Sequence, residues 1–192
     1  MRARIVAIMS VQSRPAACLS LLLALSLGAP LRVGAAERGP TPQTGIGVWY
    51  APDAPAVRDL WRPGDAGERL ILRIRVLDTR GVPVVDAQVE LWHADSFGEV
   101  HADRFRTRLP TGKDGELEVS TVLPGYIWGP RHVHVVVTHP GYPELVSRIF
   151  FKRDPVVAES DHPELAIFLE DGLAQGERTL FGDVELILPA HR

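Results

Sequence analysis

Residues 129–142, "GPRHVHVVVTHPGY", are the segment most informative about the fold. They contain two histidines, one residue apart, at the start of a run of valines. Side chains two residues apart share one face of a β-strand, so His132 and His134 face the same side. The opposite face then carries Val133, Val135 and Val137. Buried valines fix the register of a strand. The two imidazoles therefore either face water or converge on a common ligand, and a metal ion is the ligand that imidazole most often binds.

Other segments show the same alternation of apolar and polar residues, which is typical of half-buried strands. They are residues 68–77, 87–95, 116–122, 145–151 and 183–188. Turn sequences such as "DTRGVPVVD" and "TGKDG" separate them, and the chain holds 17 Gly and 16 Pro. Short strands with Gly/Pro turns predict an all-β fold, an antiparallel β-sandwich with loop-rich connections. Within the long loop from Asp154 to Gly182 we expect one short helix near residues 163–170.

Composition sets the outer limits. The 192 residues are 45% hydrophobic, which suits one domain with a real core. The formal net charge of -3 gives no basic signature, so we expect no nucleic acid partner.

The first 36 residues form a separate segment. Arg2, Arg4 and Arg14 precede an apolar run at about residues 16–31, and small residues follow at Gly34–Ala36. This order is typical of a secretory signal peptide. A membrane anchor is the alternative, but prolines and glycines leave the run short of the roughly 20 residues that a spanning helix needs. We therefore predict a signal peptide at 1–36, an extended N-terminal arm at 37–67 and a β-sandwich domain at 68–192. The protein is then secreted or periplasmic, with no membrane association after cleavage.

Several blocks of the chain resemble the intradiol ring-cleavage dioxygenases. They are "GVPVVDAQVELWHADSFGE", "KDGELEVSTVLPGY", "RHVHVVV", "ELVSRIFFKRDP" and "FGDVELIL", and they follow the family's order over roughly residues 68–188. The resemblance implies a β-sandwich that binds one non-haem ferric ion through two tyrosines and two histidines. It also implies a small catechol-like aromatic substrate, cleaved with O2 between the two hydroxyl-bearing carbons.

The family's metal ligands carry over only in part. The two histidine positions fall on His132 and His134. The later tyrosine falls on Tyr126 when the residues are counted back from the histidines, and on Ile127 when they are counted forward from Pro124-Gly125; we favour Tyr126. The first tyrosine position holds Val100, which cannot bind a metal. His101 next to it is a candidate replacement, and water or no ligand are the alternatives.

The cationic residues of the family pattern are also shifted. Gly129 stands where the family has an arginine three residues before the first histidine, and Arg131 lies close by at a different phase of the strand. Arg148 stands where the family usually has a glutamine, and it could supply a cation near a bound anion. We therefore predict Tyr126, Arg131 and Arg148 as catalytic residues.

Two classes of function follow. The first is a secreted dioxygenase of the intradiol type that acts on a catechol-like aromatic and O2. Its metal is Fe(3+) or, as the alternative, a divalent metal. The second is a catalytically altered or inactive protein of the same fold that acts as a metal-binding or ligand-binding module. The sequence leaves an oligomeric assembly open in either case.

Overall fold

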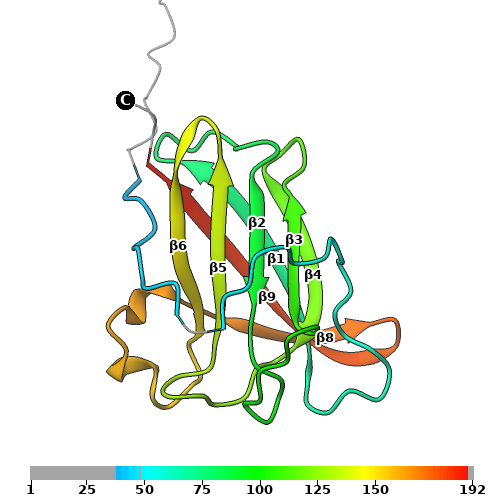
Figure 1. Cartoon of the computed structure of the whole chain (residues 1–192). Coiled ribbons are helices and arrows are strands. Elements are labelled where there is room, and N and C mark those ends of the chain that lie inside the picture. The colour runs from blue at the N-terminus through cyan, green and yellow to red at the C-terminus, as the bar shows by residue number, and fades with distance from the viewer. Residues whose placement is uncertain (1–37, 48, 190–192) are drawn as a thin grey trace, which may run out of the picture. The chain divides into compact units, whose positions relative to one another are not determined.

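The computed structural model describes residues 38–47 and 49–189, and in this part of the chain the strands form two sheets (Figure 1). The first sheet has the order β4 (Glu116–Val122), β1 (Arg69–Asp78), β9 (Glu177–Leu188) and β8 (Leu169–Ala174). The second has the order β3 (Arg106–Pro110), β2 (Gln88–Trp92), β5 (His132–His139), β6 (Tyr142–Phe151) and β7 (Ala166–Ile167). The predicted all-β sandwich is confirmed.

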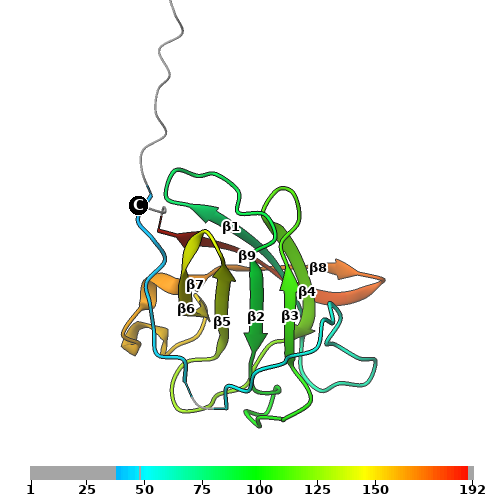
Figure 2. The same cartoon turned by 45° about the horizontal axis from the view of Figure 1, so that its top comes forward.

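The hydrophobic core lies between the two sheets, which Figure 2 shows one behind the other. From the second sheet it takes the alternate valines of β5, Val133, Val135 and Val137, each fully buried. From the first sheet it takes the alternate residues Leu70, Leu72 and Ile74 of β1. Because β5 gives its valines to this core, His132 and His134 are placed on the outer face of the second sheet.

The structure departs from the predicted antiparallel pairing in two pairs of strands. β1 pairs with β9 in parallel along its whole length, and β6 pairs with β7 in parallel, while the other strand pairs are antiparallel. The long connection between β6 and β9 carries the chain to the other sheet. The last strand therefore enters beside β1 from the same end.

Two local elements also differ from the prediction. The helix expected near residues 163–170 is a single 3-10 turn, η2 (Pro163–Leu165), followed by β7 and β8; a further 3-10 turn, η1, covers Val157–Glu159. Ala166 is already extended and pairs with Phe150 of β6, so this pairing ends the turn. The strand β3, "RTRLP", was not predicted, because its arginines hide the alternation that its buried Thr107 and Leu109 show in the structure.

The arm before β1 is extended and crosses the outer face of the second sheet, from β6 to β3 (Figure 1). The amide of Thr44 donates to the carbonyl of Val146 in β6, and the amide of Arg108 in β3 donates to the carbonyl of Pro55. The arm thus forms a roof over the histidine face of β5. The predicted signal peptide lies outside the described residues. No helix in the part of the chain that the structure describes is long and apolar enough to span a membrane.

Candidate functional site

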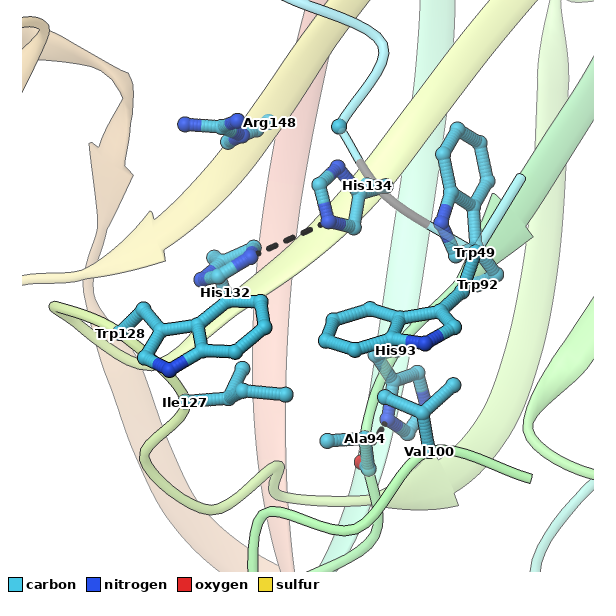
Figure 3. Close-up of a pocket in the computed structure, with 11 residues that line it drawn as sticks. Trp49, Trp92, His93, Ala94, Val100, Ile127, Trp128, His132, His134 and Arg148 are labelled. Atoms are coloured by element: carbon cyan, nitrogen blue, oxygen red, sulfur yellow. Dashed lines mark hydrogen bonds between the residues drawn. The ribbon is translucent and has the colours of Figure 1, made fainter.

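A cavity of about 210 Å³ lies between the arm and the outer face of the second sheet, and we call it the inner cavity (Figure 3). The strands β2, β5 and β6 provide its floor, and the arm and two loops provide its walls. Its lining residues are Gly47, Trp49, Trp92, His93, Ala94, Val100, Ile127, Trp128, His132, His134 and Arg148. Segments up to about 100 residues apart in the sequence therefore meet at this one place.

The two imidazoles of β5 converge inside this cavity. The Nε2 atoms of His132 and His134 lie 3.2 Å apart, and the ring planes meet at 84°. The Nδ1 atom of His132 lies 2.7 Å from the carbonyl oxygen of Pro130, so Nδ1 carries the proton and donates it to that oxygen. The Nε2 atom of His132 is then the nitrogen that carries the lone pair, and it faces Nε2 of His134. Two nitrogens that each lie about 2.0–2.1 Å from one metal are separated by roughly this distance, so the pair fits two ligands of a single ion.

His134 is held firmly on both of its faces. The Trp92 ring stacks on it at a centroid distance of 4.7 Å and an interplanar angle of 7°. On the arm side Gly47 approaches so closely that a Cβ at this position would collide with the imidazole, and its φ of +77° also favours glycine. The Nδ1 atom of His134 is buried without a hydrogen-bond partner among the described residues. The ring is therefore oriented by packing on both faces and by the contact of its Nε2 atom with His132.

Both imidazoles are neutral at ordinary pH. Burial is the largest cause that lowers the pKa of His134, to about 3, and the charges of His132 and Arg148 add to it. Burial also lowers the pKa of His132, with a further contribution from Arg148. Neutral imidazole is the form that binds metals.

His93 lines the same cavity but is not free to bind a ligand. It is fully buried, its Nδ1 lies 2.6 Å from the Ala94 carbonyl oxygen, and its Nε2 lies 2.8 Å from the Thr121 hydroxyl oxygen. Burial lowers its pKa to about 4. Both ring nitrogens are therefore satisfied inside the protein, and His93 supports the cavity wall.

Arg148 brings a positive charge to the cavity. It lies directly opposite His134 in the β5–β6 pair, and its Nε is buried without a hydrogen-bond partner in the described part of the chain. None of the residues that line the inner cavity is acidic. The cavity is therefore electropositive.

The structure does not bring Tyr126 to the imidazole pair. The Tyr126 side chain lines a different cavity, 46% exposed, with the Arg131 guanidinium 4.5 Å from its ring centroid. Ile127 lines the inner cavity instead. The reason lies at Gly125, whose amide donates to the Asp95 carbonyl and which packs directly on the backbone of Gly98. With the loop anchored there, Tyr126 and Ile127 face different cavities, and the position in the inner cavity falls to the isoleucine.

The other predicted site residues have different placements. Val100 lines the inner cavity, where the resemblance places the first tyrosine. His101 does not line it; its Nε2 lies 2.8 Å from Oδ2 of Asp95. That carboxylate also accepts hydrogen bonds from the amides of Phe97 and Glu99, so it holds the turn after β2. Arg131 stacks on Tyr126, and its amide donates to Asp154, outside the inner cavity.

Sequence reasoning missed the contribution of the arm. Gly47 and Trp49 close the cavity, and the Trp49 ring stacks on Trp128 at 5.0 Å. No periodic pattern marks these residues, because the arm is neither helix nor strand. An isolated tryptophan in a Gly/Pro-rich segment was the one signal that could have found them.

Comparisons with known proteins agree with this architecture. A family model described as "Dioxygenase" matches residues 47–127. Catechol 1,2-dioxygenase 2 of Acinetobacter lwoffii is 29% identical over 195 aligned positions, which cover 82% of this chain and 70% of that protein. The protocatechuate 3,4-dioxygenase beta chain of Burkholderia cepacia is 32% identical over 113 residues, 48% of this chain and 48% of that one. For chlorocatechol 1,2-dioxygenase of Rhodococcus opacus the match likewise spans about half of the relative, 48%.

Solved structures show the same fold. The dioxygenase domain of a dioxygenase–carbohydrate-binding protein fusion from Streptomyces sp. SirexAA-E aligns with a TM-score of 0.70 and 27% identity, over 79% of this chain and 99% of that one. Catechol 1,2-dioxygenase of Acinetobacter radioresistens aligns with a TM-score of 0.72 at 21% identity, over 80% of this chain and 64% of that one.

The fold and the His-x-His strand at the cavity define a class, the intradiol-type β-sandwich proteins. Within that class the chain is a divergent relative of the intradiol ring-cleavage dioxygenases, in which Val100 stands at the first tyrosine position.

The side chains present fit one kind of metal site and not another. The imidazole pair supplies two well-oriented nitrogen ligands. The ferric site that the resemblance implies needs two phenolates as well, and Val100 and Ile127 line the cavity instead. The cavity therefore fits an ion held by two histidines, with its other ligands coming from water or a bound molecule. It does not fit ferric iron held by two tyrosines and two histidines.

Proposed function

We propose that the protein is a metal-dependent oxidoreductase of the dioxygenase kind, which binds a small catechol-like aromatic in the inner cavity. The convergence of His132 and His134 on one point, 3.2 Å apart at Nε2, carries this proposal. Its relatives are dioxygenases of catechols and related aromatics, which supports the same general reaction.

His132 and His134 would hold the metal through Nε2. Imidazole suits iron, copper, nickel and zinc, and zinc has no redox chemistry, so iron is the first metal to test. When bound, the metal would supply the coupling between O2 and the electron-rich ring. Without phenolate ligands we expect Fe(II) rather than Fe(III) to be held.

The remaining residues of the cavity bind and orient the ring. Trp49, Trp92 and Trp128 offer aromatic faces, and Val100 and Ile127 offer aliphatic walls. These surfaces favour a flat apolar ring beside the imidazoles. Arg148 stabilises negative charge on the bound molecule. We keep Arg131 and Tyr126 out of this assignment because they lie at a different cavity.

We also propose that residues 1–36 direct the protein out of the cytoplasm, so that it acts as a secreted or periplasmic protein. The basic start, the short apolar run and the small residues before Glu37 support this. N-terminal sequencing of the protein from its native compartment should find a start near Ala36 or Glu37. An intact Met1 would contradict it.

Metal loading and oxygen uptake test the reaction. The protein is stripped of metal and reloaded without air with Fe(II), Cu(II) or Zn(II); metal content and O2 consumption with catechol are then measured. We expect the iron-loaded protein to consume O2 and give a product heavier by two oxygen atoms. His132→Ala and His134→Ala should lose both metal and O2 uptake. His139→Ala, on the same strand but outside the cavity, is the matched control and should keep both.

The second candidate is a binding protein without ring cleavage, and the aliphatic residues at both tyrosine positions favour it. In that case the protein binds metal or an aromatic molecule at the same cavity, yet no loaded form consumes O2 with catechol. Retention of metal with no product in any loaded form would replace the first proposal with this one.

A further inference from the structure

The charge balance of the inner cavity points to the kind of aromatic that it binds. Its eleven lining residues include one guanidinium, Arg148, and no carboxylate. The lining also includes three imidazoles, His93, His132 and His134. A bound divalent ion would add further positive charge. No carboxylate of the inner cavity compensates this charge, so the cavity favours a bound molecule that brings negative charge with it.

One buried donor of Arg148, its Nε atom, is unsatisfied in the described part of the chain. The position of Arg148 on β6, opposite His134, fixes it beside the imidazole pair, and Figure 3 shows its guanidinium at the edge of the cavity near the two rings. Its Nε atom is buried and has no hydrogen-bond partner among the described residues. A buried donor without a partner is unfavourable, and more so when the group is charged. A carboxylate could accept two parallel hydrogen bonds from such a group.

A second, outer cavity limits where the negative group can lie. This outer cavity of about 480 Å³ shares Trp128, His132 and Arg148 with the inner one, so the two cavities adjoin at Arg148. Beyond the junction it is lined by Glu159 and Asp161. These acidic residues repel an anion from the outer space, which leaves the junction at Arg148 as the favourable place.

We propose that the ligand of this pocket is an aromatic acid, and that Arg148 selects it by pairing with its carboxylate while the ring lies over His132 and His134. The inference rests on the proposed function only in placing the ring at the imidazole pair. The aromatic walls from Trp49, Trp92 and Trp128 suit the ring, and the guanidinium suits the acid group.

The test compares probes of the same shape in which a carboxylate is replaced by a neutral amide. Binding of 3,4-dihydroxybenzoate and 3,4-dihydroxybenzamide, and of benzoate and benzamide, is measured by tryptophan fluorescence, with and without added Fe(II). We expect each acid to bind at least about tenfold more tightly than its amide, since a hydrogen-bonded charge pair contributes about 1.5–3 kcal/mol. Arg148→Gln should bring the ratio near one, and Arg148→Lys should keep part of it. Arg75→Gln, which removes an exposed arginine of β1, is the matched control and should keep the full ratio.

Equal binding of acid and amide by the parent protein, or an unchanged ratio in Arg148→Gln, would overturn the inference. Its failure is separate from a failure of the proposed function. The benzoate and benzamide pair needs neither metal nor O2, so acid selectivity can persist in a protein that never consumes O2. Conversely, an active protein with no preference for acids would keep the proposed function and lose this inference.

Discussion

Strand β5 and the loop that leads into it, residues 123–131, both carry residues that the resemblance marks as metal ligands, and the two regions behave differently. The strand delivers both of its histidines to the inner cavity. The loop delivers Ile127 and turns Tyr126 toward another cavity. In the strand the buried valines on one face decide where every other side chain points. The loop has no such alternating pattern. A change of one residue in its length after Gly125 would change which side chain enters the inner cavity.

The β-sandwich can therefore keep the metal ligands that lie on its strands while the ligands expected from its loops are missing. The sheet keeps two nitrogen ligands because they share the strand with the core. The first tyrosine position, Val100, and the second cavity position, Ile127, both lie outside strands. The two tyrosine ligands that the resemblance implies, and that are absent from the inner cavity, both belong to loop positions.

The largest expected effect tests whether the valines really fix the strand. Val135→Asp places a carboxylate in a fully buried position, and we expect a loss of about 3–5 kcal/mol in the free energy of unfolding or a failure to fold. Tyr126→Asp in the loop, where the side chain is 46% exposed, should cost less than about 1 kcal/mol. Urea unfolding measures both. Equal losses would show that the loop is as constrained as the strand.

The next effect concerns pH and the buried His93 that supports the wall of the inner cavity. Its folded pKa of about 4 lies below the unfolded value of 6.5, so the unfolded chain binds more protons between these values. The stability from this group is therefore fully present above pH 6.5, and it falls by up to about 3 kcal/mol as the pH drops to 4. Unfolding measured at steps across this window should show the decline. His93→Asn should weaken the slope, and an unchanged slope would mean that His93 is not the cause.

A smaller effect is expected on metal affinity, which should depend on the two histidines of β5 and not on His101. Because each imidazole would supply one of only two protein ligands, His134→Ala should weaken Fe(II) or Zn(II) binding on the order of 100-fold, at least as much as losing a group that merely orients a ligand. His101→Ala should change metal binding little, since its Nε2 pairs with Asp95 outside the inner cavity. Calorimetric titration with Zn(II) measures both. A comparable loss in His101→Ala would mean that this loop swings into the cavity.

The smallest effect tests the loop directly. Tyr126→Phe should leave metal affinity within about twofold, because the phenol lies at another cavity. Ile127→Tyr should place a phenol at the pair and, with ferric iron, give a visible charge-transfer band that the parent protein lacks. Absorption spectra of the iron-loaded variants measure this. A band in the parent that Tyr126→Phe abolishes would show that Tyr126 reaches the metal and that the two regions are equivalent after all.

The fold class and the position of the imidazole pair follow from local patterns in the chain. Alternation of valines with histidines in residues 132–137 decides the strand and its two faces, because a slip of one residue would expose the valines to water and bury the histidines. The block order over residues 68–188 then identified the kind of sandwich. These features are local and periodic, and such patterns can be recognised in a single chain.

The surroundings of the imidazole pair, in contrast, depend on how distant segments of the chain pack together. In the folded protein Gly47 packs on His134, and Trp49 stacks on Trp128. Arg148 lies beside the imidazoles, and its Nε atom has no hydrogen-bond partner among the described residues. Ile127, rather than Tyr126, lines the inner cavity. The parallel pairing of β1 with β9 is of the same kind. Each depends on contacts between segments far apart in the chain or on the packing of one glycine against another. The free energy of such contacts comes from the assembled fold, and no stretch of the sequence carries it alone.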